Sequence, residues 1–117
     1  MILRRWSARA TGDGAQQYIR HFHQEVLPHL QQVGGYQGAL LLRREINALF
    51  EIQVLTFWDT MDAIGQFAGT DVDSAVVEDE AKAVLHDFDT RVTHCEVVLD
   101  ARNLPFPARR YSRSTRK

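Results

Sequence analysis

Cysteine, proline and long apolar runs are scarce in this 117-residue sequence. The single cysteine, Cys95, cannot form an internal disulfide, and its apolar neighbours predict a small buried side chain rather than a reactive thiol. The longest apolar run, at residues 39–42, is far shorter than a membrane span, and the amino-terminal MILRRW lacks the apolar stretch of a signal peptide. We therefore expect a cytoplasmic protein without a membrane partner.

Phosphate-binding glycine loops are also missing. The stretch GGYQG at residues 34–38 lacks the lysine and the following helix that such a loop needs, so nucleotides are not implied. The sequence has no internal repeat, and 117 residues with 44% hydrophobic side chains suffice for one compact core but not for two. We expect one domain over residues 1–100 and a tail at residues 101–117.

Acidic residues are absent from that tail. Residues 1–100 contain all fifteen acidic residues and eight basic ones, a net charge of −7, whereas residues 101–117 contain the other six basic residues. Without interleaved stacking aromatics or a recognition helix, six positive charges do not predict nucleic-acid binding. We expect the basic tail to lie on the acidic body of its own or a partner subunit.

Hydrophobic periodicity divides the domain into strands and helices. The strands are expected at residues 2–9, 36–45, 48–58 and 91–99. The helices are expected at residues 15–33, 59–69 and 74–88. TGDG at residues 11–14 is expected to form a turn before the first helix, and Pro28 is expected to kink that helix near its end.

This order, β-α-β-β-α-β, predicts a ferredoxin-like α+β fold, in which a four-stranded antiparallel sheet has helices on one face and its fourth strand pairs with the first. The third strand is apolar on both faces, because Ile52 and Val54 alternate with Leu55 and Phe57. The face without helices must then be covered as well. A homodimer that packs sheet against sheet would cover it and form a dimeric α+β barrel.

Three stretches resemble the antibiotic biosynthesis monooxygenase domain of the dimeric α+β barrel superfamily: LTFWD at residues 55–59, DTMDAIGQFAG at residues 59–69 and VTHCEVV at residues 92–98. The resemblance covers residues 1–100. It implies a scaffold that serves cofactor-independent oxygenation of phenols or quinols, oxidative haem degradation or lactone isomerisation, and that also occurs in members with no known activity. The fold alone does not select among these.

Trp58 matches the tryptophan that lines the pocket between sheet and helices in the oxygenase and haem-degrading members. Two other positions depart from the haem-degrading pattern. The histidine expected on the following helix falls at or beside Phe67, which cannot bind iron, and the first strand has Trp6 and Ser7 where those members have asparagine. The resemblance therefore implies oxygenation without a cofactor and disfavours haem.

The last expected strand contains a pair of titratable side chains. His94 and Glu96 share one of its faces, and pairing with the first strand would bring them to Arg4 and Trp6. In a cofactor-free oxygenase His94 would remove a phenolic proton, and Arg4 would hold the resulting anion. If Cys95 and its apolar neighbours take the helix-facing core instead, His94 and Glu96 face the partner subunit and hold two chains together.

The first helix has the spacing of a metal-binding face. His21, Glu25 and His29 follow one another at four-residue steps, but Pro28 interrupts the geometry between the last two. Solvated residues on the flank of the helix account for the same pattern. We expect no metal site, and haem binding through His21 or His94 is the least favoured alternative.

The sequence thus predicts a homodimeric, cofactor-independent monooxygenase acting on a small aromatic molecule of the quinol or phenol class. The alternative is a protein of the same fold that binds a small molecule without chemistry or is only structural. His94 is the expected catalytic residue. The expected substrate-binding residues are Arg4, Trp6, Tyr18, Trp58 and Glu96, although the aromatic ones would also serve as ordinary core.

Overall fold

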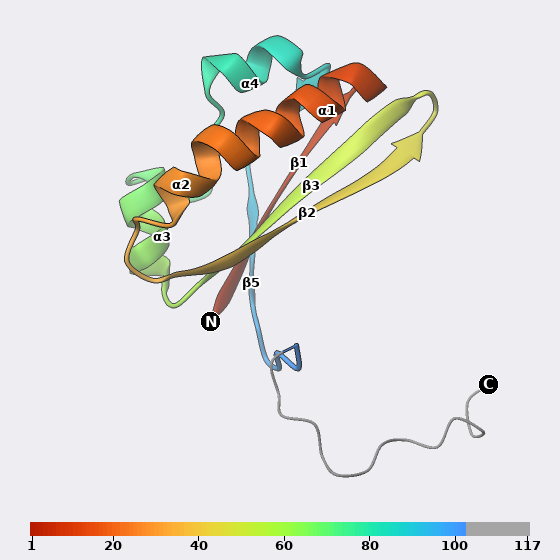
Figure 1. Ribbon diagram of the computed structural model, residues 1–117. Coiled ribbons are helices and arrows are strands. Elements are labelled where there is room, and N and C mark those ends of the chain that lie inside the picture. The colour runs from red at the N-terminus through yellow and green to blue at the C-terminus, as the bar shows by residue number, and fades with distance from the viewer. Residues whose placement is uncertain (103–117) are drawn as a thin grey trace, which may run out of the picture.

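The structure, a computed structural model, describes residues 1–102, so the expected tail lies outside the described residues except for its first two positions. Figure 1 shows the arrangement of the elements. In chain order these are β1 (Ile2–Ala10), α1 (Gly12–His21), the π-helical turn η1 (Phe22–Val26), α2 (Leu27–Leu30), β2 (Tyr36–Ile46), β3 (Leu49–Trp58), α3 (Met61–Ala68), α4 (Asp79–Val84), β4 (Asp87–Phe88) and β5 (Thr93–Glu96).

The strands form one antiparallel sheet in the order β2-β3-β1, and the short strands β4 and β5 both pair with the remaining edge of β1. The expected pairing of the last strand with the first is confirmed. So is the ferredoxin-like α+β class, with the difference that two short strands share the place of one long strand. Among the described residues, no helix is long and apolar enough to cross a membrane.

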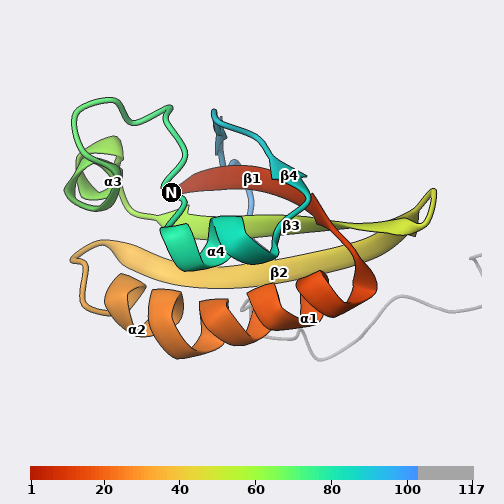
Figure 2. The ribbon, with the colours of Figure 1, turned by 90° about the horizontal axis from the view of Figure 1, so that it is seen from above.

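The helices cover one face of the sheet (Figures 1 and 2). The buried side chains of β1 and β3 alternate, with Trp6 and Ala8 in β1 beside Val54 and Ile52 in β3, and these residues join α1 and α3 in a single hydrophobic core. The period of two along each strand predicts such a face, because successive side chains point to opposite sides of a sheet.

The first helix begins earlier than expected. Thr11 is its cap, since the hydroxyl of Thr11 accepts a hydrogen bond from the Gly14 amide at 3.0 Å, and TGDG is therefore a helix start rather than a separate turn. Ahead of Pro28 the helix widens into η1, where the Leu27 amide bonds to the Phe22 carbonyl. A π-helical turn at this place accommodates a proline, which has no amide hydrogen to donate.

The prediction of a helix over residues 74–88 is wrong except at α4, which is the only helical part of this segment. The backbone on its carboxyl side pairs with β1 instead, because the His86 amide donates to the Arg9 carbonyl at 2.7 Å and the Asp89 amide to the Ser7 carbonyl at 3.0 Å. On its amino side, residues 69–78 form a loop, called here the 69–78 loop, that connects α3 to α4. Apolar spacing alone did not reveal that an edge of β1 was free for pairing.

The sequence left open which face of the last strand enters the core. The structure excludes the alternative in which Cys95 and its apolar neighbours face the helices. His94 is in register with Arg4, which is buried on the helix-covered face, so His94 lies on that face too. Cys95 is exposed on the opposite face, contrary to the expectation of burial, and Leu99 is 73% exposed. The reason is that the 69–78 loop covers this part of the sheet and offers polar partners rather than apolar ones.

Candidate functional site: a pocket between sheet and helices

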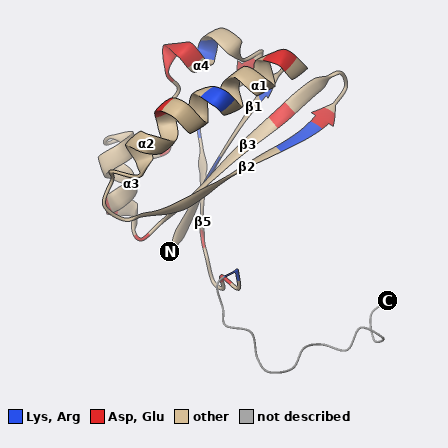
Figure 3. Ribbon diagram, in the orientation of Figure 1, with Lys and Arg blue, Asp and Glu red and all other residues tan. Residues whose placement is uncertain are grey.

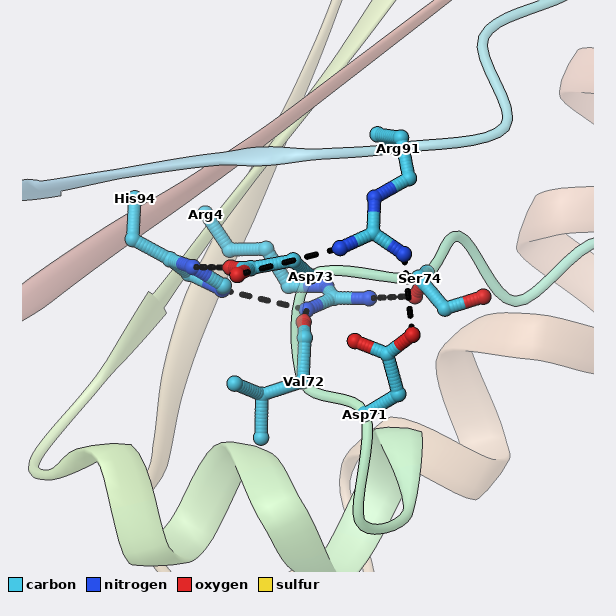
Figure 4. Close-up of polar contacts among 7 residues, drawn as sticks. All are labelled: Arg4, Asp71, Val72, Asp73, Ser74, Arg91 and His94. Atoms are coloured by element: carbon cyan, nitrogen blue, oxygen red, sulfur yellow. Dashed lines mark hydrogen bonds and ion pairs between the residues drawn. The ribbon is translucent and has the colours of Figure 1, made fainter.

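Arg4 is the central side chain of the site. Only 5% of the residue is exposed, and its guanidinium donates from Nη1 to the Val72 carbonyl at 2.6 Å and from Nη2 to the Ser74 carbonyl at 2.9 Å. Figure 4 shows the guanidinium held between these loop carbonyls and the His94 ring. Burial lowers the pKa of Arg4, and the nearby Asp73 carboxylate opposes this shift. A guanidinium remains charged under such conditions, so the site contains a fixed buried cation.

His94 lies behind Arg4. Its Nε2 is 3.1 Å from Arg4 Nη1, and its Nδ1 is 3.2 Å from Asp73 Oδ1. A guanidinium can only donate, so Nε2 accepts from Arg4 and Nδ1 carries the hydrogen that it donates to Asp73. Burial and the positive charge of Arg4 lower the pKa of His94, against the opposing effect of Asp73. His94 is therefore neutral at neutral pH, and its basic lone pair is already used.

The 69–78 loop is fastened to the sheet edge at several points around this cluster. Arg91 pairs with Asp71 at 2.8 Å and reaches Asp73 at 4.0 Å, while the Val92 amide donates to the Asp73 carbonyl at 2.8 Å. Together with the carbonyls bound by Arg4, these contacts fix the loop over the end of α3 (Figure 4). The loop thus holds Arg4 in one place, which is a condition for precise ligand recognition.

A small pocket with a cavity volume of about 50 Å³, open to solvent on one side, lies beside Arg4. We call this space the Arg4 lobe. Its walls come from β1, β3, the long first helix, α3 and the loop, and apolar and aromatic side chains dominate them. The lining residues are Arg4, Trp6, Tyr18, Phe22, Val26, Leu30, Val54, Thr56, Phe67, Val76 and Val92.

A second space with a cavity volume of about 90 Å³, also partly open, continues from the first toward α4, and we call it the His21 lobe. The two lobes share their middle walls, including Trp6, Tyr18 and Phe67. His21, His29 and Glu78 line the second lobe but not the first. Burial and the charge of Glu78 raise the pKa of Tyr18. The phenol of Tyr18 consequently stays protonated and available as a hydrogen-bond donor within the pocket.

Three of the residues predicted to bind substrate meet in this pocket: Arg4, Trp6 and Tyr18. The other predicted residues lie outside its wall. His94 sits behind Arg4, Glu96 is exposed on the edge strand, and Trp58 is fully buried, where its Nε1 donates to Thr56 Oγ1 at 2.8 Å.

Sequence reasoning missed several parts of the site. Phe67 stacks on Trp58 with ring centroids 5.7 Å apart and lines both lobes, although it drew notice only as a residue that cannot bind iron. Asp73 and Val76 belong to the 69–78 loop, which was expected to be partly helical, and no sequence signal pointed to them. The expected pairing of the last strand with the first, which brings His94 to Arg4, was the signal that located the cluster.

The possible metal-binding spacing on the first helix does not produce a cluster. Among residues 1–102, no group of three histidine, cysteine or acidic side chains is placed so that it could hold a metal ion. Glu25 is exposed, and the His29 ring lies 6.0 Å from the ring of Phe67. The π-helical turn between these positions changes the regular four-residue step on which the pattern depended.

Comparison with solved structures identifies the fold. The chain matches a variant of MhuD with two manganese protoporphyrin IX molecules bound per active site, at 18% identity and a TM-score of 0.59, over 86% of this chain and 97% of that one. It matches a candidate antibiotic biosynthesis monooxygenase from Bacillus cereus at 12% identity and a TM-score of 0.58, over 86% and 97% of the two chains. It also matches a candidate antibiotic biosynthesis monooxygenase from Bordetella bronchiseptica at 17% identity and a TM-score of 0.59, over 84% of this chain and 97% of that one.

These likenesses confirm the expected fold of the antibiotic biosynthesis monooxygenase domain, and at such identities they establish the fold alone. A scan against protein-family models gives no match, and a search of curated proteins gives none either.

Proposed function

We propose that this protein binds a small aromatic molecule of the quinol or phenol class in the pocket beside Arg4 and oxygenates it without a cofactor. The observation that supports this most strongly is a single buried guanidinium in an otherwise largely apolar and aromatic pocket. Flat apolar walls favour an aromatic ring, and one fixed cation favours an anionic oxygen at a defined place on that ring.

The proposed reaction needs the substrate, oxygen and water, with water as the proton carrier. A phenolic proton passes to water and leaves an electron-rich anion, whose oxygen is stabilised by Arg4, and the peroxide formed later takes a proton back from water. A ring carbon of the anion adds O₂ to form a hydroperoxide, which then loses water and leaves a carbonyl group. One oxygen atom of O₂ enters the product, the other leaves as water, and the substrate supplies the electrons.

In this proposal His94 is a positioning residue rather than the base. Its Nε2 accepts a hydrogen bond from Arg4, and Asp73 holds its other nitrogen. This chain of hydrogen bonds fixes the guanidinium from behind while its pocket side faces the substrate. It also keeps His94 neutral, so that a second positive charge does not repel the guanidinium.

We further propose a homodimer formed by sheet-to-sheet packing. On the face without helices, Leu40, Leu42 and Ile46 of β2 are 41%, 44% and 37% exposed. They pair with Leu55, Gln53 and Leu49 of β3, and the Arg44–Glu51 ion pair separates Ile46 from Leu42. The apolar part of this face is therefore centred on Leu40, Leu42 and Leu55. Figure 3 shows that the charged residues of this hairpin gather toward its turn and leave the middle of the strands uncharged. Such a surface is typical of a subunit interface.

Oxygen uptake with a panel of anthrones and naphthoquinols tests the proposed activity. The wild type should consume oxygen and convert anthrones to anthraquinones and naphthoquinols to hydroxynaphthoquinones, each with release of one water. Arg4→Gln should lower the rate about 10- to 100-fold, as expected for loss of a charge-stabilising group. The matched control is Arg5→Gln, because Arg5 is the neighbouring residue on β1, is exposed and faces away from the pocket. Equal rates for wild type and Arg4→Gln would refute the proposal.

Two other outcomes would assign the protein to the alternatives. Saturable binding of these compounds without oxygen uptake would indicate a binding protein of the same fold. A Soret band on titration with haemin would support porphyrin binding, which the MhuD likeness brings into consideration.

A further inference from the structure

The two lobes of the pocket differ in chemistry. The Arg4 lobe ends in a cation, whereas the His21 lobe ends in an imidazole beside a carboxylate. The walls between these ends are the aromatic and aliphatic side chains that both lobes share. A ligand that fills both lobes therefore meets Arg4 in one lobe, the His21–Glu78 pair in the other, and the apolar walls that the lobes share.

One ring nitrogen of His21, Nε2, is buried without a hydrogen-bond partner. Only 11% of its side chain is exposed, and Nε2 is the one buried side-chain nitrogen or oxygen that has no hydrogen-bond partner among the described residues. This atom lies 3.0 Å from Glu78 Oε1, but without the alignment of a hydrogen bond. A buried polar atom without a hydrogen-bond partner costs free energy, so a ligand group that reaches Nε2 and bonds to it would recover that cost.

A hydroxyl group satisfies both members of this pair. It can accept a hydrogen bond from the imidazole and at the same time donate one to the carboxylate, whereas a carboxylate in the ligand would be repelled by Glu78. Glu78 is half-exposed at the rim, so it can shift toward an incoming group without unpacking the core.

We propose that the His21–Glu78 pair binds a hydroxyl group of the ligand, so that the pocket selects flat aromatic molecules with an anionic oxygen at one end and a hydroxyl group at the other. This inference rests on the proposed function, because it assigns the second end of the same pocket. It narrows the ligand class to aromatic hydroxy acids and to diphenols of which one oxygen is ionised.

Three probes with one skeleton test the inference: 6-hydroxy-2-naphthoate, 2-naphthoate and methyl 6-hydroxy-2-naphthoate. Their affinities are measured by isothermal titration. For the wild type, removal of the hydroxyl group should weaken binding about tenfold, because one hydrogen bond to a charged or buried partner is lost. Esterification removes the charge that Arg4 recognises and should weaken binding by at least as much.

The variant His21→Leu should bind 6-hydroxy-2-naphthoate and 2-naphthoate with equal affinity and should still discriminate against the ester. His23→Leu is the matched control, since His23 is exposed on the same helix and should keep the tenfold preference. Thermal unfolding of both variants shows that they are folded.

Two results would overturn the inference in distinguishable ways. If the acid probes bind but the hydroxyl group makes no difference to the wild type, or if His21→Leu keeps the preference, the pocket stands and the role of His21 and Glu78 is wrong. If none of the three probes binds, the pocket itself is not a ligand site, and both the inference and the proposed function fail.

Discussion

At the scale of single residues, the role of His94 changes most between sequence and structure. Its spacing from Glu96 identified a polar face on the last strand, and strand pairing correctly brought it to Arg4. What the sequence could not show is that Asp73, twenty-one residues earlier, would hold its other nitrogen. The local pattern therefore placed His94 beside Arg4 correctly. Its catalytic role stays a prediction, and we propose a positioning role instead because both ring nitrogens have partners.

The lowered pKa of His94 predicts a specific dependence of stability on pH. Above its ordinary value near 6.5 the histidine is neutral in both the folded and the unfolded chain, so it has no effect. As the pH falls below that value the unfolded chain binds a proton first, and the free energy of unfolding decreases until the folded pKa is reached. The slope from this group stays below about 1.4 kcal/mol per pH unit.

His94→Gln should reduce this slope, because an amide can accept from Arg4 and donate to Asp73 without titrating. The measurement is urea denaturation at several pH values between 7 and 5, with His23→Gln as an exposed control. If the His94→Gln curve runs parallel to that of the wild type throughout this range, His94 is not a neutral residue held by Arg4.

At the scale of elements, the sequence predicted β1, β2, β3 and α3 well because each has a strong pattern of its own. The segment between α3 and β5 was predicted poorly for a physical reason. Its apolar residues have helical spacing, yet the free edge of β1 binds its backbone amides and the Arg4 guanidinium binds its carbonyls. Interactions between segments distant in sequence decided its conformation, and no local pattern records them.

The contact between α1 and α4 gives a second prediction. A β-carbon added at Gly14 would lie 2.4 Å from the Val84 carbonyl oxygen, which is backbone and cannot rotate away. Gly14→Ala should therefore lower the free energy of unfolding by about 1–3 kcal/mol, as overpacking does. Because α4 begins beside Glu78 and lines the His21 lobe through Ala81, ligand affinity should fall as well.

Gly34→Ala is the matched control for this substitution. A β-carbon at Gly34 meets nothing within 4 Å, so the free energy of unfolding should change by no more than about 0.5 kcal/mol. Chemical denaturation of the two variants checks the pair. Similar stabilities for both would mean that α4 does not pack against the start of α1 as described.

At the scale of the whole molecule, the helices protect one face of the sheet and leave the other exposed, with apolar side chains at Leu40, Leu42 and Ile46. The alternation of side chains in β3 was sufficient to predict this, because a strand that is apolar on both faces needs two covering layers. The partner that supplies the second layer is the proposed copy of the same chain.

Leu42→Glu should convert the proposed dimer to a monomer, since it places a charge in the middle of the uncovered face. Multi-angle light scattering measures the mass directly, and Ala83→Glu, an exposed position on α4, is the control on the helix side. A wild-type chain that is already monomeric at micromolar concentration would contradict sheet-to-sheet pairing.

The central claim is that the pocket between helices and sheet is the ligand site, and nitrogen-15 chemical-shift mapping tests it most directly. On titration with 6-hydroxy-2-naphthoate, we predict saturable shifts that are largest for the lining residues Trp6, Tyr18, Phe67 and Val76. Shifts confined to the opposite face of the sheet, around Leu40 and Leu42, or no saturable shifts at all, would contradict the account.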